Sequence, residues 1–118
     1  MTAQRKTQTA EKKIPHAADV LSFVSRRKPK GSGLNCWDVT PSGSYSDDCA
    51  AGKALAEEYL TFIGAYPTVG NAALLGWIVS DMIKDGDQSK GLRIGFLHEV
   101  NRCAMFAAHD AGSGGFRP

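Results

Sequence analysis

Three successive segments between Ser46 and Asp110 place apolar residues at the spacing of an α-helix, and no other pattern in the chain restricts its fold as strongly. Pro67 separates the first segment from the second, and Gly86 separates the second from the third. Proline lacks a helical hydrogen-bond donor and glycine is common just beyond a helix end, so both residues mark boundaries. The pattern predicts an all-α domain, built as a small three-helix bundle over residues 46–110.

The third segment permits a second interpretation over residues 92–100, where apolar and polar residues also alternate as they do in a β-strand. The same residues continue at helical spacing through the run NRCAMFAA without a turn signal. The uninterrupted segment is much longer than an ordinary strand of about 5–6 residues. We therefore predict a helix here and keep the strand as the alternative.

Basic residues are concentrated at the N-terminus. Residues 1–32 contain eight basic and two acidic residues, a net charge of +6, whereas residues 33–118 contain six basic and ten acidic residues, a net charge of −4. The first thirteen residues are polar and aperiodic, so they offer no apolar surface to bury. We predict that residues 1–32 form a basic, largely flexible arm whose first part is disordered.

One part of this arm has helical periodicity. Ala18, Leu21 and Val24 share one helix face, and Pro15 suits the first turn of a helix. These residues predict a short amphipathic helix near 15–26. A helix of this length is marginal by itself in water, so it would need to dock on the bundle as a fourth helix or bind a partner.

The stretch KPKGSG, from Lys28 to Gly33, interrupts regular structure because it holds two glycines and a proline. We place the boundary between the arm and a helical domain of residues 33–110 at this stretch. A short extended segment at 34–45 is expected to precede the first core helix. The C-terminal AGSGGFRP, residues 111–118, is predicted to be a flexible tail.

Five residues near this boundary are candidates for binding. Arg26, Arg27, Lys28 and Lys30 form a dense cationic cluster, which can neutralise the phosphates of a nucleic acid or attract an acidic protein. The cluster can equally be a solvated surface. Trp37 stands before a Pro-Ser-Gly turn, and we expect it either to plug one end of the helices or to anchor a partner.

The chain has three cysteines, and an odd number argues against a disulfide framework. Cys49 falls in the first turn of the first predicted helix, where aligned backbone N–H groups stabilise a thiolate. Asp47 and Asp48 act in the opposite direction, because adjacent negative charge disfavours a thiolate. Because of its place in the first turn, Cys49 is the candidate reactive thiol. The alternative is that Cys49 is a small, partly buried structural residue.

The possible zinc ligands are Cys36, Cys49, His98 and Cys103, and they form none of the tight Cys-x-x-Cys pairs that structural zinc sites use. His98 and Cys103 diverge on a helix because they are five residues apart. We therefore predict no metal site. The chain also lacks a phosphate-binding glycine loop and a nucleophile elbow, so we name no catalytic residue and no cofactor.

These observations favour a small non-enzymatic protein-binding module, a regulator or adaptor whose partner is another protein. The alternatives are a nucleic-acid-associated protein that uses the basic arm, and a small thiol- or metal-dependent enzyme. No apolar run approaches the ~18 residues that span a bilayer, so we expect no membrane association. The first residues also lack the apolar stretch of a secretory signal, so we expect a cytoplasmic location.

Overall fold

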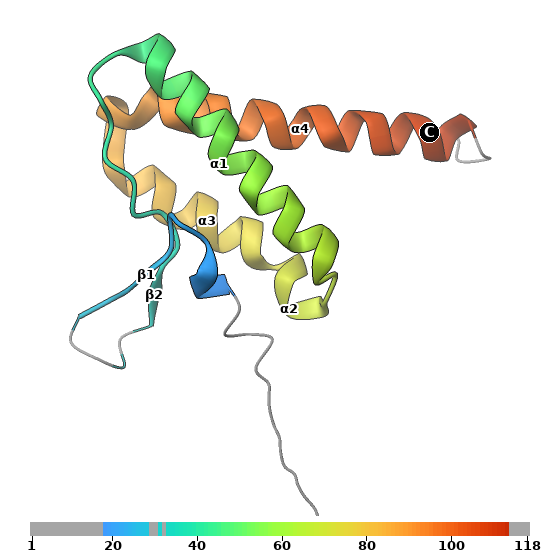
Figure 1. Ribbon diagram of the computed structural model, residues 1–118, viewed down its shortest axis with the longest axis horizontal. Helices are drawn as coiled ribbons and strands as arrows, with labels where there is room; N and C mark the ends of the chain where they lie inside the picture. Colours follow the sequence, from blue (N-terminus) through green and yellow to red (C-terminus); the bar gives the residue numbers. More distant parts are fainter. Residues whose placement is uncertain (1–17, 29–30, 32, 114–118) are drawn as a thin grey trace, which may run out of the picture. The chain divides into compact units, whose positions relative to one another are not determined.

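The computed structural model describes residues 18–28, 31 and 33–113 (Figure 1). Over these residues the chain is mostly helical, and the predicted all-α class is confirmed. In chain order the elements are β1 (Ser25–Arg26), β2 (Leu34–Asn35), α1 (Tyr45–Ala65), α2 (Val69–Ala72), α3 (Leu74–Met82), the 3₁₀ helix η2 (Ile83–Ser89) and α4 (Lys90–Ser113). The predictions for residues 1–17, 29–30, 32 and 114–118 lie outside the described part of the chain. Residues 111–113, predicted to belong to the flexible tail, are instead the last residues of α4.

The two long helices follow the sequence pattern closely. α1 ends at Ala65, because Pro67 cannot continue the helical hydrogen bonding. Asp47 and Asp48 lie in its first turn, where their negative charges interact favourably with the positive end of the helix dipole. α4 includes all of residues 92–100, so the helical interpretation of that segment is confirmed and the strand alternative is wrong.

The second predicted helix is interrupted. The hydroxyl oxygen of Thr68 accepts a hydrogen bond from the N–H of Asn71 at 3.1 Å and caps the short α2. Ala73 then separates α2 from α3, and α3 continues into the tighter turns of η2. Gly86, with a φ of 72° and a ψ of −160°, kinks the chain within η2, in a conformation that glycine adopts without steric cost.

The short helix expected near 15–26 is corrected by the structure. Residues 18–20 form a single 3₁₀ turn, a second turn follows in which the N–H of Val24 donates to the carbonyl of Leu21, and β1 begins at Ser25. β1 pairs antiparallel with β2, with Ser25 opposite Asn35 and Arg26 opposite Leu34. Ala18, Leu21 and Val24, the apolar residues at helical spacing, are nevertheless buried.

The chain divides into two compact units. Unit 1 combines Met1–Thr40 with Thr61–Gly86, and unit 2 combines Pro41–Leu60 with Asp87–Pro118. This division does not follow the boundary expected at residues 32–33. The described part of the arm belongs to the same unit as α2 and α3, so it is built into the fold.

Unit 1 packs the β1–β2 hairpin against α3 (Figure 1). The rings of Phe23 and Trp37 meet with centroids 5.6 Å apart, and both side chains are buried. The N–H of Asp38 donates to the carbonyl of Phe23 at 2.8 Å, which continues the hairpin pairing beyond the strands. From α3 the buried side chains are Leu74, Ile78, Asp81 and Met82.

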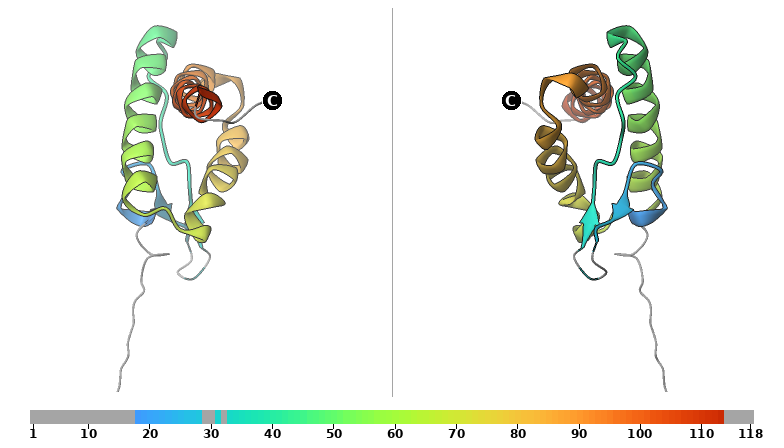
Figure 2. Two further views of the ribbon diagram at one scale, coloured as in Figure 1. Left: turned by 90° about the vertical axis from the view of Figure 1, so that its right-hand side faces the viewer. Right: turned by 90° about the vertical axis from the view of Figure 1, so that its left-hand side faces the viewer.

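Unit 2 contains a close crossing of α1 and α4, which is visible from two directions (Figures 1 and 2). A β-carbon added to Gly95 would lie 2.1 Å from the carbonyl oxygen of Cys49, and one added to Gly52 would lie 2.3 Å from that of Leu92. The helices can therefore approach this closely only because both residues are glycine. Beside the crossing, the Tyr59 and Phe96 rings pack with centroids 5.7 Å apart.

Candidate binding cavity

One face of α3 supplies half of the candidate site. Leu74, Trp77, Asp81 and Lys84 recur at intervals of three and four residues, so they fall on the same side of the helix and its continuation. Asp81 and Leu74 are buried, whereas the side chain of Trp77 is 64% exposed. An exposed tryptophan on the same face as a buried carboxylate is an unusual combination for a purely structural surface.

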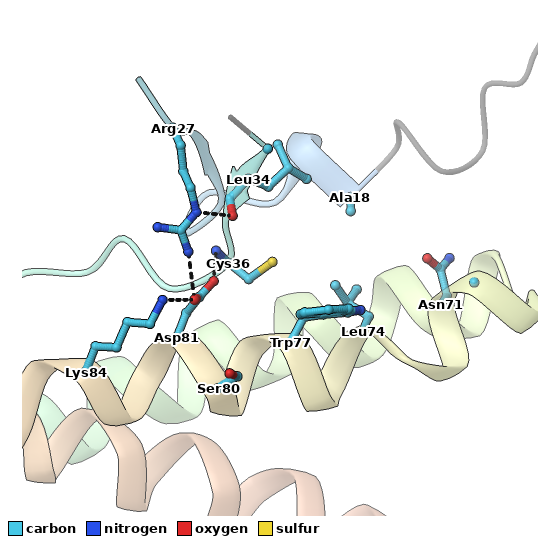
Figure 3. A pocket seen from close by; sticks show the side chains of 12 residues that line it. Ala18, Arg27, Leu34, Cys36, Asn71, Leu74, Trp77, Ser80, Asp81 and Lys84 are labelled. Carbon is cyan, nitrogen blue, oxygen red and sulfur yellow. Dashed lines mark hydrogen bonds and ion pairs between the residues drawn. The ribbon is translucent and has the colours of Figure 1, made fainter. Parts of the chain in front are cut away.

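The β1–β2 hairpin supplies the other half. The N–H of Arg27 donates to the carbonyl of Gly33 at 2.8 Å, and its Nε donates to the carbonyl of Leu34 at 2.9 Å. The first bond pairs the Arg27 backbone with the hairpin, and the second holds the guanidinium against it. Cys36 follows β2 directly and is buried, with its sulfur directed toward the space beside α3 (Figure 3).

Asp81 joins the two halves. Its Oδ1 accepts hydrogen bonds from Arg27 Nη2 at 2.8 Å and from Lys84 Nζ at 3.0 Å, and its Oδ2 accepts from the N–H of Cys36 at 2.8 Å (Figure 3). Burial acts to raise the pKa of Asp81, but the Cys36 N–H and the two cations together hold that pKa below its usual range. The carboxylate is therefore ionised at neutral pH and serves as a structural link between hairpin and helix.

A cavity of about 510 Å³ lies between the hairpin and the α2–α3 segment (Figure 3). Its apolar lining comes from Ala18, Leu34, Leu74 and Trp77, and its polar lining includes Arg27, Asn71, Ser80, Asp81 and Lys84. The volume falls within the range of about 300–1,000 Å³ that is typical of ligand sites. A mostly apolar lining with a few convergent polar groups is also the usual composition of such sites.

The cysteine of the cavity is not an activated nucleophile. Burial raises the pKa of the Cys36 thiol, and the neighbouring Asp81 carboxylate raises it further, whereas Arg27 lowers it. A thiol with a raised pKa carries little thiolate at neutral pH, and the thiolate is the nucleophilic form. The side chain of Cys36 therefore contributes apolar surface to the cavity wall.

We expect Cys36 to be alkylated at least about tenfold more slowly than the faster of Cys49 and Cys103, which are both half-buried. Timed iodoacetamide labelling of the folded chain at a pH of about 8, read by peptide mass spectrometry, measures the three rates. In urea the rates should converge, which controls for intrinsic differences between the sites. Equal rates in the folded chain would contradict the burial of Cys36, and a fastest rate at Cys49 would support its role as a reactive thiol.

Cys49, the candidate reactive thiol, lies in unit 2 and lines no part of this cavity. A side-chain hydrogen bond between Tyr45 and Cys49 raises the pKa of the Tyr45 hydroxyl. The backbone of Cys49 forms one side of the α1–α4 crossing. The reactivity of the Cys49 thiol stays a prediction.

The structure separates the members of the predicted cationic cluster. Arg26 is exposed and forms an ion pair with Asp19, whereas Arg27 is paired with Asp81. Lys28 is exposed, and Lys30 lies outside the described residues. Two of the four cations therefore already have carboxylate partners within the chain, which leaves less positive charge for phosphates than the sequence predicts.

The suggestion that Trp37 anchors a partner is corrected by its burial. Its side chain is only 2% exposed and packs on Phe23, so it has no surface to offer another molecule. The exposed tryptophan at the candidate site is Trp77. The helical spacing of Trp77, Asp81 and Lys84 was available in the sequence, but nothing local indicated that the hairpin would cover this face.

Within residues 18–28, 31 and 33–113, no group of three or more His, Cys, Asp or Glu side chains is placed to hold a metal ion. Within the same ranges, no helix combines the length and the apolar character that crossing a membrane requires.

Comparison of the chain with models of protein families, with curated proteins and with solved structures gave no match.

Proposed function

We propose that this chain is a small non-enzymatic binding module, a regulator or adaptor, and that the cavity of unit 1 receives a segment of a partner protein. The observation that carries the proposal is the exposure of Trp77 at the edge of an open, mostly apolar cavity. Tryptophan is one of the residue types enriched among the few that dominate protein–protein binding energy. Its indole offers a large apolar surface at a small cost in conformational entropy.

The polar groups of the cavity support binding rather than catalysis. The ionised Asp81 carboxylate already accepts three hydrogen bonds, so it is poorly suited to exchange a proton with a substrate. The raised pKa of Cys36 opposes nucleophilic catalysis at the same wall. These features support a binding module better than they support a thiol- or metal-dependent enzyme.

The nucleic-acid alternative has weaker support. Arg26 and Arg27 already form ion pairs with carboxylates of unit 1. The exposed rings of unit 1 that could stack on bases, Trp77 and Tyr66, lie outside the arm. We also retain as proposals a cytoplasmic location, which the free thiols of Cys36, Cys49 and Cys103 favour, and the three-helix bundle expected from the sequence.

Selection from a displayed random-peptide library tests the proposed function. The full chain is used as bait, and the enriched peptides are measured against wild type and Trp77→Ala. We expect Trp77→Ala to weaken binding about 30-fold, the effect of losing a hot-spot tryptophan. The change should leave folding intact because the side chain is exposed.

Ile83→Ala is the matched control. Ile83 is 65% exposed, close to the 64% of Trp77, and belongs to unit 1, but it does not line the cavity. Peptides that bind wild type and Ile83→Ala alike, but not Trp77→Ala, support the proposal. Failure to enrich any peptide, or equal binding to Trp77→Ala, would show that the cavity is not a protein-binding site.

A further inference from the structure

The charge of the cavity is unbalanced. Its lining contains two cations, Arg27 and Lys84, and one anion, Asp81. The anion is nearly covered, because its side chain is 9% exposed and both its oxygens accept hydrogen bonds. The cations are more accessible, with side-chain exposures of 36% for Arg27 and 60% for Lys84. An approaching ligand therefore meets net positive charge.

The two cations also keep hydrogen-bonding capacity. A guanidinium and an ammonium each carry several N–H donors. The guanidinium of Arg27 donates through Nε to Leu34 and through Nη2 to Asp81, and over the described residues Nη1 donates no bond. Lys84 donates to Asp81 alone among the described residues. Because Asp81 fixes both cations in place, a ligand carboxylate would meet donors that are already oriented.

The apolar part of the lining and one of its two cations lie along the same helical wall, and the other cation comes from the hairpin. Leu74 and Trp77 belong to α3, and Lys84 lies about two turns beyond Trp77 along the same face. Arg27 stands above Asp81 on the hairpin, at the end of the cavity nearer to Lys84 than to Leu74 (Figure 3). An occupant that satisfies both parts must carry an apolar group and, beside it, negative charge.

We infer that the cavity recognises an acidic peptide segment, in which an apolar side chain packs against Trp77 and Leu74 while a neighbouring Asp or Glu carboxylate pairs with Lys84 and Arg27. This inference rests on the proposed function and specifies its ligand. The charge complementarity determines the occupant, because a basic or neutral segment would leave the Lys84 and Arg27 donors unmatched.

The most enriched peptide from the library selection is the probe. It is synthesised with a fluorescent label, together with a copy in which every Asp and Glu is replaced by its amide. Fluorescence anisotropy is recorded at about 0.05 M and about 0.15 M salt, because screening weakens exposed charge pairs. We expect the acidic peptide to bind at least about tenfold more tightly than its amide copy, with the ratio falling as salt rises.

The variant Lys84→Gln tests whether the preference for the acidic peptide over its amide copy arises in the cavity. The variant removes one accessible charge, and we expect the acidic peptide to lose about fivefold in affinity while the amide copy is unchanged. Lys53→Gln, which removes an exposed charge from α1 in unit 2, should change neither. Arg27 is not altered, because its loss would disturb the bonds that join hairpin and helix.

The outcomes separate this inference from the proposed function. If enriched peptides depend on Trp77 but bind equally well as amides, the cavity is a protein site and the inference about acidic ligands is wrong. Insensitivity of the acidic peptide to Lys84→Gln would also overturn it. Displacement of the peptide by a single-stranded oligonucleotide at about 0.15 M salt would assign the cations to phosphate instead.

Discussion

Replacing Gly95 with alanine should lower the free energy of unfolding by about 3 kcal/mol, the upper end of the usual range for an overpacked interior. The added β-carbon would lie 2.1 Å from the carbonyl oxygen of Cys49 and 2.8 Å from its Cα. Both are backbone atoms, so no side-chain rotation relieves the clash. The two helices would have to separate locally, and the packing beside the crossing, including the Tyr59–Phe96 ring pair, would loosen.

Urea unfolding followed by circular dichroism measures this effect, and Gly52→Ala should behave in the same way from the opposite helix. Gly76→Ala is the control, because Gly76 is exposed on α3 and an added β-carbon there meets nothing within 4 Å. Alanine at that position should stabilise the chain by about 0.5–1 kcal/mol, through the lower conformational entropy of its unfolded state. Gly95→Ala with wild-type stability would show that α1 and α4 do not cross this closely in solution.

The second large effect is expected from Asp81→Ala. The change removes the acceptor of the Arg27 and Lys84 side chains and leaves the N–H of Cys36 without its partner. Breaking one side of a buried ion pair costs about 3–5 kcal/mol, and we expect the lower end of that range because Arg27 and Lys84 are partly exposed. Asp38→Ala should change stability by less than about 0.5 kcal/mol, because Asp38 is exposed and contributes its backbone N–H.

The stability difference between wild type and Asp81→Ala should depend on pH. The pKa of Asp81 is below its usual range in the folded chain, so the ionised carboxylate contributes stability that is fully present above the unfolded pKa of about 3.9. That contribution is lost as pH falls through the lower folded pKa. Urea unfolding at several pH values should therefore show the two proteins converging in acid. A difference that stays constant down to the acid limit would contradict the charge network.

The sequence predicted the parts of the fold that depend on neighbouring residues. Pro67 ends α1, and the long periodic segment that contains residues 92–100 is helical, as the local pattern indicates. Each of these outcomes is determined by hydrogen bonds and apolar spacing within a few turns of one helix.

The hairpin and the cavity could not be predicted in this way. Ala18, Leu21 and Val24 have the spacing of a helix, but residues 18–20 form only a 3₁₀ turn and the chain enters β1 at Ser25, which pairs with Asn35. The cavity requires Cys36 and Arg27 to meet Asp81 across sequence separations of 45 and 54 residues. A single sequence contains no local signal for such pairings. The helical spacing of Trp77, Asp81 and Lys84 places them on one face of the helix. That face becomes one wall of a cavity only when the hairpin folds over it.

The two units alternate along the chain, with Met1–Thr40 and Thr61–Gly86 in one and Pro41–Leu60 and Asp87–Pro118 in the other. No single cut of the polypeptide therefore releases either unit with all its parts. During synthesis on the ribosome, the hairpin emerges long before Asp81, the residue that fastens it to α3. The amino-terminal segment consequently cannot be removed as a detachable arm, and deletion of residues 1–32 would remove β1 and Arg27 from the body of unit 1.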